Sequence, residues 1–585
     1  MMEEARPPTH RGRLRSDAPS DRISRHSILV PSCARSVLAI VAAALALVRR
    51  PGGASAATGQ VKPKSVIFFV SDGMGPGYVT AARDSRLCES AGGGRDEGAN
   101  ENGTTGALRL EAHLVGLVRT RSADAFVTDS AAGATAFATG YKTNNHVVAE
   151  VPIGAADVAA DVATGRGGAA YAPVGTILEG AQAAGKRTGI VTTARVTHAT
   201  PAAFSAHVAD RDDENAIARQ QVAGLDVDVL LGGGRRHFLP ARHVAGSARH
   251  DDVDLVAEAV TRGYDVVSDA RGLEAAVAGR PRRLLGLFAP SHMPYEIDRT
   301  ATPGKNGTRV PTLDGMTTAA LDVLGGSPEG FFLLVEAGRI DHAGHAGDAA
   351  TAIAEVCAYD RAFAVATAFA ASRPDVLVVG TSDHDTGGLS VGCCGEYALD
   401  VAAIGRQRAS AETVTANVVS AYEAAGGSPG VQVGIGILAS ALTSAGRNVS
   451  DAATSAAADV NADVAGTGAG SGDVSAADLR ELHALATATT ASSAGAAGYE
   501  GYALQNKVGE VLNRPNLVGF TSSGHTGVDV PLFAYGASAE RFRGYMENTR
   551  VGREMINLLG VDPKAGYAAV RARVGGAATT TAKSG

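Results

Sequence analysis

Residues 65–75 read SVIFFVSDGMG, in which an unbroken apolar run ends in a carboxylate among small residues. An apolar run without polar alternation is typical of a strand that is buried on both faces, as in a parallel sheet covered by helices. Four further runs of this kind, with helical patterns at 176–184 and 348–372 between them, lie at residues 189–193, 227–231, 331–335 and 376–380. The alternation predicts an α/β fold, a three-layer α/β/α sandwich around a mainly parallel central sheet.

Acidic and histidine residues stand directly after three of these runs. Asp72 follows the first run, Glu336 follows residues 331–335, and Asp383 with His384 follows residues 376–380. Ligands of open α/β sheets bind beyond the carboxyl ends of the strands, so these side chains are expected to meet at one edge. Mixed carboxylate and imidazole ligands favour zinc, whereas an all-oxygen set favours magnesium.

Asp341 and His345 extend this pattern. Their i, i+4 spacing places both on one face of a helix that leaves the strand ending at Glu336, where they could share one ion. Taken singly, each such residue is more often a surface histidine or a capping aspartate. Their convergence at strand ends favours a metal centre.

Ser130 lies in the stretch 127–136, VTDSAAGATA, where Asp129 or Ser130 begins a helix of small residues. The simplest interpretation is a helix N-cap. The alternative is a nucleophile whose position at a helix N-terminus offers free backbone N–H groups to a phosphoryl group. The stretch alone does not decide between the two.

Six motifs then occur in one order along the chain. They are Asp72-Gly73-Met74-Gly75, Thr128-Asp129-Ser130-Ala131-Ala132, Thr200-Pro201-Ala202-Ala203, Asp341 with His345, Asp383-His384, and Gly524-His525-Thr526-Gly527. Together they resemble the alkaline phosphatase family, from about residue 64 to the C-terminal helix. Six ordered motifs are far more specific than any one of them.

The resemblance implies two Zn²⁺ ions and one Mg²⁺ ion. It assigns Asp341, His345 and His525 to one zinc, Asp383, His384 and Asp72 to the second, and Asp72, Thr200 and Glu336 to magnesium. Ser130 becomes the nucleophile, Arg211 the group that grips two phosphoryl oxygens, and Asp129 the residue that orients Arg211. His198 and His342 match positions near the metals at which family members differ.

The expected activity is hydrolysis of small phosphate monoesters to an alcohol and inorganic phosphate through a phosphoserine, with phosphate as a product inhibitor. Broad specificity, activity at alkaline pH and a homodimer also follow from the resemblance. A calcium site is not expected, because Ala289 stands where some relatives place a glutamate ligand. Two rivals remain: a related phosphodiesterase or sulfatase, and an inactive surface or binding protein. The sulfatase motif, Cys or Ser followed by x-Pro-x-Arg, is absent at Ser130.

The ends of the chain differ from its middle. Residues 1–57 have the basic, apolar and small-residue order of a signal peptide, with a signal anchor as the alternative. We therefore expect export, to a secreted, periplasmic or cell-surface location. Residues 58–575 form the expected catalytic domain, interrupted at about 439–497 by a low-complexity insertion or linker. The polar tail, 576–585, lacks the hydrophobic stretch of a GPI signal.

Composition limits the partners and the cross-links. A net charge of -7 over 585 residues argues against a basic surface for nucleic acid. Outside the leader, the cysteines are Cys88, Cys357, Cys393 and Cys394, which allow up to two disulfides in an oxidising compartment. Their pairing cannot be read from the sequence.

Overall fold

The computed structural model describes residues 62–90, 107–154, 170–243, 246–301, 309–393, 395–459, 474–492 and 499–581. The expected leader, residues 1–57, lies outside this part of the chain. All features below belong to the unit that begins at Val61.

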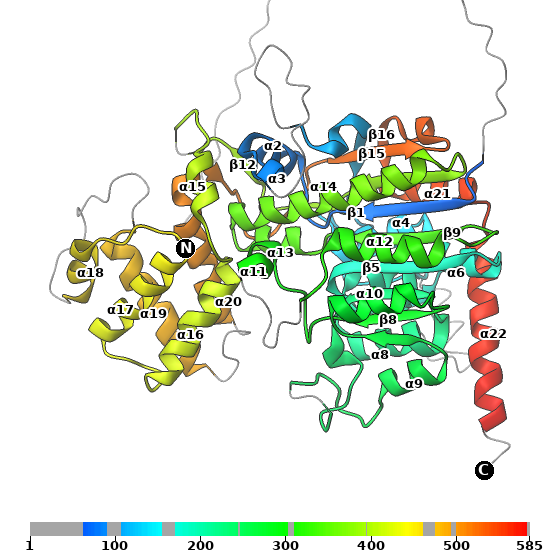
Figure 1. Ribbon diagram of the computed structural model, residues 1–585, viewed down its shortest axis with the longest axis horizontal. Coiled ribbons are helices and arrows are strands. Elements are labelled where there is room, and N and C mark those ends of the chain that lie inside the picture. The colour runs from blue at the N-terminus through cyan, green and yellow to red at the C-terminus, as the bar shows by residue number, and fades with distance from the viewer. Residues whose placement is uncertain are drawn as a thin grey trace, which may run out of the picture. The chain divides into compact units, whose positions relative to one another are not determined.

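A ten-stranded sheet forms the centre of the fold (Figure 1). In spatial order its strands are β16 (Gly544–Glu547), β2 (Leu114–Arg119), β15 (Val530–Gly536), β10 (Val376–Thr381), β1 (Ser65–Val70), β9 (Phe331–Glu336), β5 (Arg187–Arg195), β6 (Val229–Gly233), β8 (Leu284–Leu287) and β7 (Asp265–Val267). The strands from β10 to β7 are all parallel, and β15 runs antiparallel to both of its neighbours. The five runs predicted from the sequence are β1, β5, β6, β9 and β10, so the mainly parallel sheet is confirmed.

Every residue of β1 is buried, because helices cover both faces of the sheet. Ile67 and Phe69 belong to one hydrophobic cluster, whereas Val66, Phe68 and Val70 belong to another. Successive side chains of a strand point to opposite faces, so the two clusters lie on either side of the sheet. The continuous apolar run is thus explained by burial on both sides.

The helices form the two outer layers. One cluster takes side chains from α2 (Pro76–Ser85), α10 (Ala270–Ala278), α12 (Leu313–Leu324) and α14 (Ala349–Ala371). The other takes them from α4 (Ser130–Thr139), α6 (Ile177–Ala183), α7 (Ala199–Ser205), α9 (Leu255–Thr261), α21 (Asn548–Leu559) and α22 (Pro563–Thr581). Figure 1 shows α12 and α14 on the viewer's side of the sheet. The arrangement is the expected α/β/α sandwich.

Shorter elements connect these layers. They include α3 (Leu87–Ser90), α8 (Glu214–Arg219), α11 (Glu296–Ala301), α13 (Arg339–His345) and α15 (Val401–Arg406). Three two-stranded ribbons complete the described strands: β3 (Glu150–Pro152) with β4 (Tyr171–Pro173), β11 (Asp385–Thr386) with β14 (His525–Thr526), and β12 (Ser390–Val391) with β13 (Val518–Gly519).

The low-complexity stretch is more ordered than a linker. Its described parts belong to a cluster of helices, yellow to orange in Figure 1: α16 (Ala411–Ala424), α17 (Val431–Ser444), α18 (Asp451–Ala458), α19 (Ala476–Ala491) and α20 (Tyr499–Asn513). Leu438, Leu479 and Leu482 are fully buried in a core shared by these helices. Alanine has the highest helix propensity, so a stretch rich in alanine with a few spaced leucines can form packed helices.

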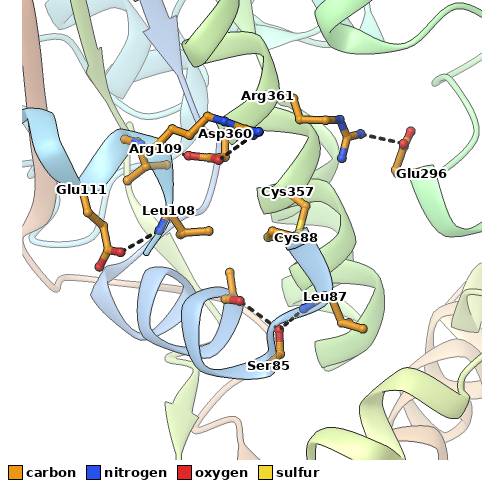
Figure 2. Close-up of a disulfide and its surroundings, with 12 residues drawn as sticks. Ser85, Leu87, Cys88, Leu108, Arg109, Glu111, Glu296, Cys357, Asp360 and Arg361 are labelled. Atoms are coloured by element: carbon orange, nitrogen blue, oxygen red, sulfur yellow. Dashed lines mark hydrogen bonds and ion pairs between the residues drawn. A yellow bond between two sulfur atoms is a disulfide. The ribbon is translucent and has the colours of Figure 1, made fainter. Parts of the chain in front are cut away.

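Cys88 of α3 and Cys357 of α14 form a disulfide across 269 residues of sequence (Figure 2). Asp360, one turn further along α14 and drawn beside Arg109 in Figure 2, accepts a 2.9 Å hydrogen bond from the backbone N–H of Leu110. The disulfide and this hydrogen bond attach α3 and the segment around Leu110 to α14. The sequence had left the cysteine pairing open.

No helix among the described residues is both long and apolar enough to cross a membrane.

Removal of the disulfide is expected to destabilise the protein by about 2–5 kcal/mol, because the bond closes a very long loop in the unfolded chain. Denaturant unfolding of a Cys88→Ser/Cys357→Ser double variant checks this against the oxidised wild type. Reduction of the wild type should lower its stability to the level of the double variant. Equal stability of all three samples would contradict a structural role for the bond.

Candidate active site

The carboxyl ends of three neighbouring strands bring the predicted side chains together. Asp72 lies two residues after β1, Glu336 is the last residue of β9, and Asp383 with His384 follows β10. All four are fully buried. The turn after β1 allows this approach, since Gly73 adopts a φ of +80° and its backbone N–H donates to Asp383 at 3.4 Å.

Several carboxylate oxygens of this group lack hydrogen-bond donors. Both oxygens of Asp72, one of Glu336 and one of Asp383 accept no hydrogen bond from any described residue. Burial, with repulsion by Asp383, holds the pKa of Asp72 well above its usual range. Burial likewise raises the pKa of Glu336 to about 8 and, with repulsion by Asp341, that of Asp383 to about 6. Buried carboxylates without donors need cations, so this edge fits metal ions.

Asp341 anchors a second part of the site. It lies with His345 on α13, and His345 Nε2 is 3.3 Å from Asp341 Oδ1, as the i, i+4 spacing predicts. His525 Nε2 lies 3.4 Å from the same oxygen and 3.2 Å from His345 Nε2. The Nδ1 atoms of both rings donate to backbone carbonyl oxygens, that of His345 to Ser523 at 2.6 Å and that of His525 to Thr128 at 2.9 Å. Two imidazole nitrogens and a carboxylate oxygen therefore face one another.

Four groups of three side chains lie close enough to hold an ion. They are Asp72, Asp383 and His384; Asp341, His384 and His525; Asp72, His198 and Glu336; and His198, His292 and His342. The first contains the three residues expected at the second zinc. The third contains two residues expected at magnesium, and the expected third, Thr200, is fully buried with a hydroxyl that has no hydrogen-bond partner among the described residues.

Ser130 is the first residue of α4 and is 1% exposed. Its Oγ lies 3.1 Å from Nε2 of His384, which places the hydroxyl directly beside the carboxylate group. Asp129 is the N-cap of the helix and accepts a 3.0 Å hydrogen bond from the backbone N–H of Ala132. Asp129 therefore confirms the helix N-cap, and the nucleophile role of Ser130, which lies beside His384, stays a prediction.

Arg211 does not extend into solvent, although it lies in the charged run 210–214, where the sequence alone would favour a solvated side chain. Its Nη1 donates to Oδ2 of Asp129 at 3.0 Å, and its Nη2 donates to Nε2 of His198 at 3.1 Å. Asp129 is in turn fixed by the backbone N–H of His146 at 3.0 Å. Arg211 thus has the partner that the resemblance implied.

Several residues of the site were not foreseen. Thr386 donates a 2.5 Å hydrogen bond to Asp341, and its position two residues after His384 was the available signal. Arg195 is the last residue of β5, and His292 follows β8 by five positions, so both lie at the same carboxyl edge. Arg195 donates to His292 Nε2. Arg339, which begins α13, donates to His342 Nδ1 at 3.2 Å.

A cavity of about 770 Å³ opens from Ser130 past these residues. Its further wall comes from the helical cluster: Glu412, Thr415 and Ala416 of α16, and Tyr502, Gln505 and Asn506 of α20. Ligand pockets commonly have volumes of about 300–1,000 Å³, so the cavity can hold a molecule larger than a phosphate ion.

Comparisons with known proteins agree with this geometry. Residues 63–561 match the sequence model of the family described as alkaline phosphatase. The repressible alkaline phosphatase of Saccharomyces cerevisiae is 32% identical over 568 residues, covering 92% of this chain and 88% of that protein. The alkaline phosphatase of Schizosaccharomyces pombe is 34% identical over 510 residues, covering 86% and 82%. The crystal structure of Thermus thermophilus alkaline phosphatase superposes with a TM-score of 0.63 at 30% identity, covering 87% of this chain and 95% of that one.

Gly73→Ala is expected to disrupt the site, because a Cβ there would stand 2.7 Å from Asp341 Cα and 2.8 Å from Thr386 Oγ1. Gly185→Ala is the matched control, since Gly185 has a φ of +74° with nothing within 4 Å of its Cβ. The control should cost on the order of 1 kcal/mol in backbone strain. Denaturant unfolding and the zinc content of each variant measure the difference. Equal losses of stability and zinc in both variants would show that the close approach of Gly73 to Asp341 and Thr386 is unimportant.

Proposed function

Since this chain belongs to the alkaline phosphatase family of phosphoric monoester hydrolases, we propose that it hydrolyses phosphate monoesters through a phosphoserine at Ser130. The observation that carries the proposal is the 3.1 Å approach of Ser130 Oγ to His384, at the edge where four buried carboxylates meet. A serine hydroxyl that only capped a helix would not need to lie beside an imidazole and buried carboxylates.

Ser130 Oγ attacks phosphorus and the ester oxygen leaves with its alcohol. Water then attacks the phosphoserine, the bond from Oγ to phosphorus breaks, and inorganic phosphate is released. Two displacements at phosphorus require the nucleophile to stay in line with the leaving oxygen, which the rigid first turn of α4 favours. All ten residues of this helix are buried, so Ser130 has little freedom to move. The backbone N–H groups at the helix start also favour a negative phosphoryl group.

Arg211 binds the phosphoryl oxygens in this proposal. Its planar guanidinium can offer two parallel N–H donors to two oxygens, which a lysine cannot do. Asp129 holds one edge of the guanidinium at 3.0 Å and so sets its orientation. Because Asp129 also caps α4, the arginine and the nucleophile are positioned by one side chain.

We propose two Zn²⁺ ions and one Mg²⁺ ion. Asp341, His345 and His525 would hold one zinc, Asp383, His384 and Asp72 the second, and Asp72, Thr200 and Glu336 the magnesium. The mixed nitrogen and oxygen sets suit zinc and the oxygen set suits magnesium. Bound divalent ions would neutralise phosphoryl charge and lower the pKa of coordinated hydroxyl groups. His198 and His342 lie beside these sets without being assigned as ligands.

A leaving oxygen that is held by a bound divalent ion would need no dedicated proton donor, so the alcohol part of the substrate can vary. Inorganic phosphate should inhibit as the product. The rival phosphodiesterase activity requires room for a second ester group at phosphorus. The ratio of monoester to diester turnover separates the two activities, and diester preference would overturn the present proposal. Every residue that the family resemblance assigns as a ligand is present in this chain, which speaks against an inactive homologue.

Export is part of the proposal, supported by the signal-like order of residues 1–57 and by the Cys88–Cys357 disulfide, which an oxidising compartment favours. A secreted, periplasmic or cell-surface location follows. A homodimer rests on the family resemblance. We also propose residues 58–575 as one catalytic domain that includes the helical cluster.

Ser130→Ala should lower kcat for a chromogenic monoester by at least about a hundredfold, because the covalent route is lost. Ser372→Ala, at the exposed end of α14, is the control and should retain full activity. Acid quenching with labelled substrate should trap phosphate on the wild type and on the control, but not on Ser130→Ala. Full activity of Ser130→Ala would remove the serine from the mechanism.

Dialysis against a chelator should abolish activity and lower the melting temperature, since the buried carboxylates lose their counter-charge. Zinc with magnesium should restore both properties, whereas magnesium alone should not. Asp383→Asn should bind less zinc than the wild type, and Asp252→Asn, whose side chain is 93% exposed, should bind the same amount. A metal-free sample with undiminished turnover would contradict the metal-dependent proposal.

A further inference from the structure

The cavity beside Ser130 contains three arginine–histidine pairs that the proposed hydrolysis leaves unexplained. Arg211 donates to His198 Nε2, Arg195 donates to His292 Nε2, and Arg339 donates to His342 Nδ1. All six side chains line the cavity. The three imidazole rings stand close together, with centroids 4.2 Å apart for His292 and His342 and 5.3 Å for His198 and His292.

Spacing alone would permit a metal ion among His198, His292 and His342. The arginines argue against one. A guanidinium can only donate hydrogen bonds, so each contacted ring nitrogen must accept, and the other nitrogen of each ring carries the proton. Neither nitrogen then has a lone pair free for a metal. Three guanidinium charges beside the rings would also repel a cation.

The same pairs leave donors that face the cavity. Arg195 binds Glu214 through Nε at 2.7 Å and His292 through Nη1, and its Nη2 has no hydrogen-bond partner among the described residues. Because this nitrogen is not enclosed by protein atoms, it is open to the cavity. His342 accepts through Nδ1, so its Nε2 carries a proton and is open in the same way.

These donors are held firmly. Arg195 is fixed by Glu214, which also accepts a 2.5 Å hydrogen bond from Thr197. Arg339 is fixed by Glu412 at 2.7 Å and stacks on the ring of Tyr295, with its guanidinium carbon 3.6 Å from the centroid. Groups that are already oriented lose little freedom when they bind a ligand.

We propose that Arg195 and His342 bind a second oxyanion on the leaving group of the substrate, so that the enzyme prefers monoesters whose alcohol part carries a carboxylate or a further phosphate. The proposal rests on the proposed phosphomonoesterase function and adds its preferred substrate class. Ser130 and Arg211 line the same cavity as these two residues. The other carboxylates that line it are already engaged, Glu412 by Arg339 and Asp341 as a proposed metal ligand.

Two esters of similar size test the proposal. 3-Phosphoglycerate carries a carboxylate where glycerol 3-phosphate carries a hydroxymethyl group. At equal ionic strength, kcat/KM of the wild type should be higher for 3-phosphoglycerate by on the order of tenfold, as expected for a hydrogen bond to a charged group. The bisphosphate of propane-1,3-diol, compared with its monophosphate, shows whether a phosphate is accepted as well. A preference for 3-phosphoglycerate supports the second-anion site.

Arg195→Lys should bring the kcat/KM ratio of the two glycerol-derived esters close to one. A lysine can still pair with Glu214, but a single ammonium cannot also hold His292 and offer a free donor in the same place. His292→Phe is a second variant. It keeps the ion pair of Arg195 with Glu214 but removes the hydrogen-bond acceptor of Arg195 Nη1, so the guanidinium is oriented less firmly. Gln505→Ala, which changes an uncharged side chain of α20 in the same cavity, is the matched control and should keep the wild-type ratio.

The outcomes separate the two levels of inference. If the wild type hydrolyses both esters equally, or if Arg195→Lys and His292→Phe both retain the preference, the second-anion site is wrong and the phosphatase proposal stands. If the wild type hydrolyses none of the monoesters with its metals bound, the proposed function itself fails.

Discussion

The constraint on which the rest of this structure depends is the burial of four carboxylates, Asp72, Glu336, Asp341 and Asp383, at one edge of a parallel sheet. Each costs several kcal/mol to hold ionised without a counter-charge, and the cost grows when they repel one another. Three of them have a raised pKa for this reason. A cation bound at this edge would offset that cost, so metal binding is expected to stabilise the fold.

Close packing around these carboxylates then determines where the nucleophile lies. α4 can approach the strand ends because its residues are small, and a Cβ on Gly133 would stand only 3.1 Å from Asp383 Cβ. The helix thereby places Ser130 beside His384 and leaves its N-cap, Asp129, free to orient Arg211. The small residues of α4 could be explained in the sequence by a capped helix alone. In the structure they are required for the close packing of the site.

The sequence predicts the features that depend on neighbouring residues, and it does not predict those that depend on contacts between distant segments. The buried strands and the pair of Asp341 with His345 follow from local periodicity, and the structure has both. Motifs that resemble a known family carried the prediction of Arg211, whose charged neighbours alone pointed to solvent. The pairing of Cys88 with Cys357 and the position of His292 depend on contacts between distant segments, which no single sequence contains. The alanine-rich stretch was interpreted as an insertion or linker, and the helices of its described parts were not foreseen because low complexity hides its helix propensity.

The wall of the cavity also bears on how substrate preference can vary. Arg339 joins the helical cluster to α13, the helix that carries Asp341 and His345, through its pair with Glu412. A change at Arg339 therefore disturbs the metal ligands together with the wall. Arg195 lies on β5 rather than on α13, and it is held by Glu214 and His292, neither of which is a proposed metal ligand. Selection can thus alter the leaving-group side of the cavity at Arg195 with less effect on the phosphoryl site, because the two sides are supported by separate elements of the fold.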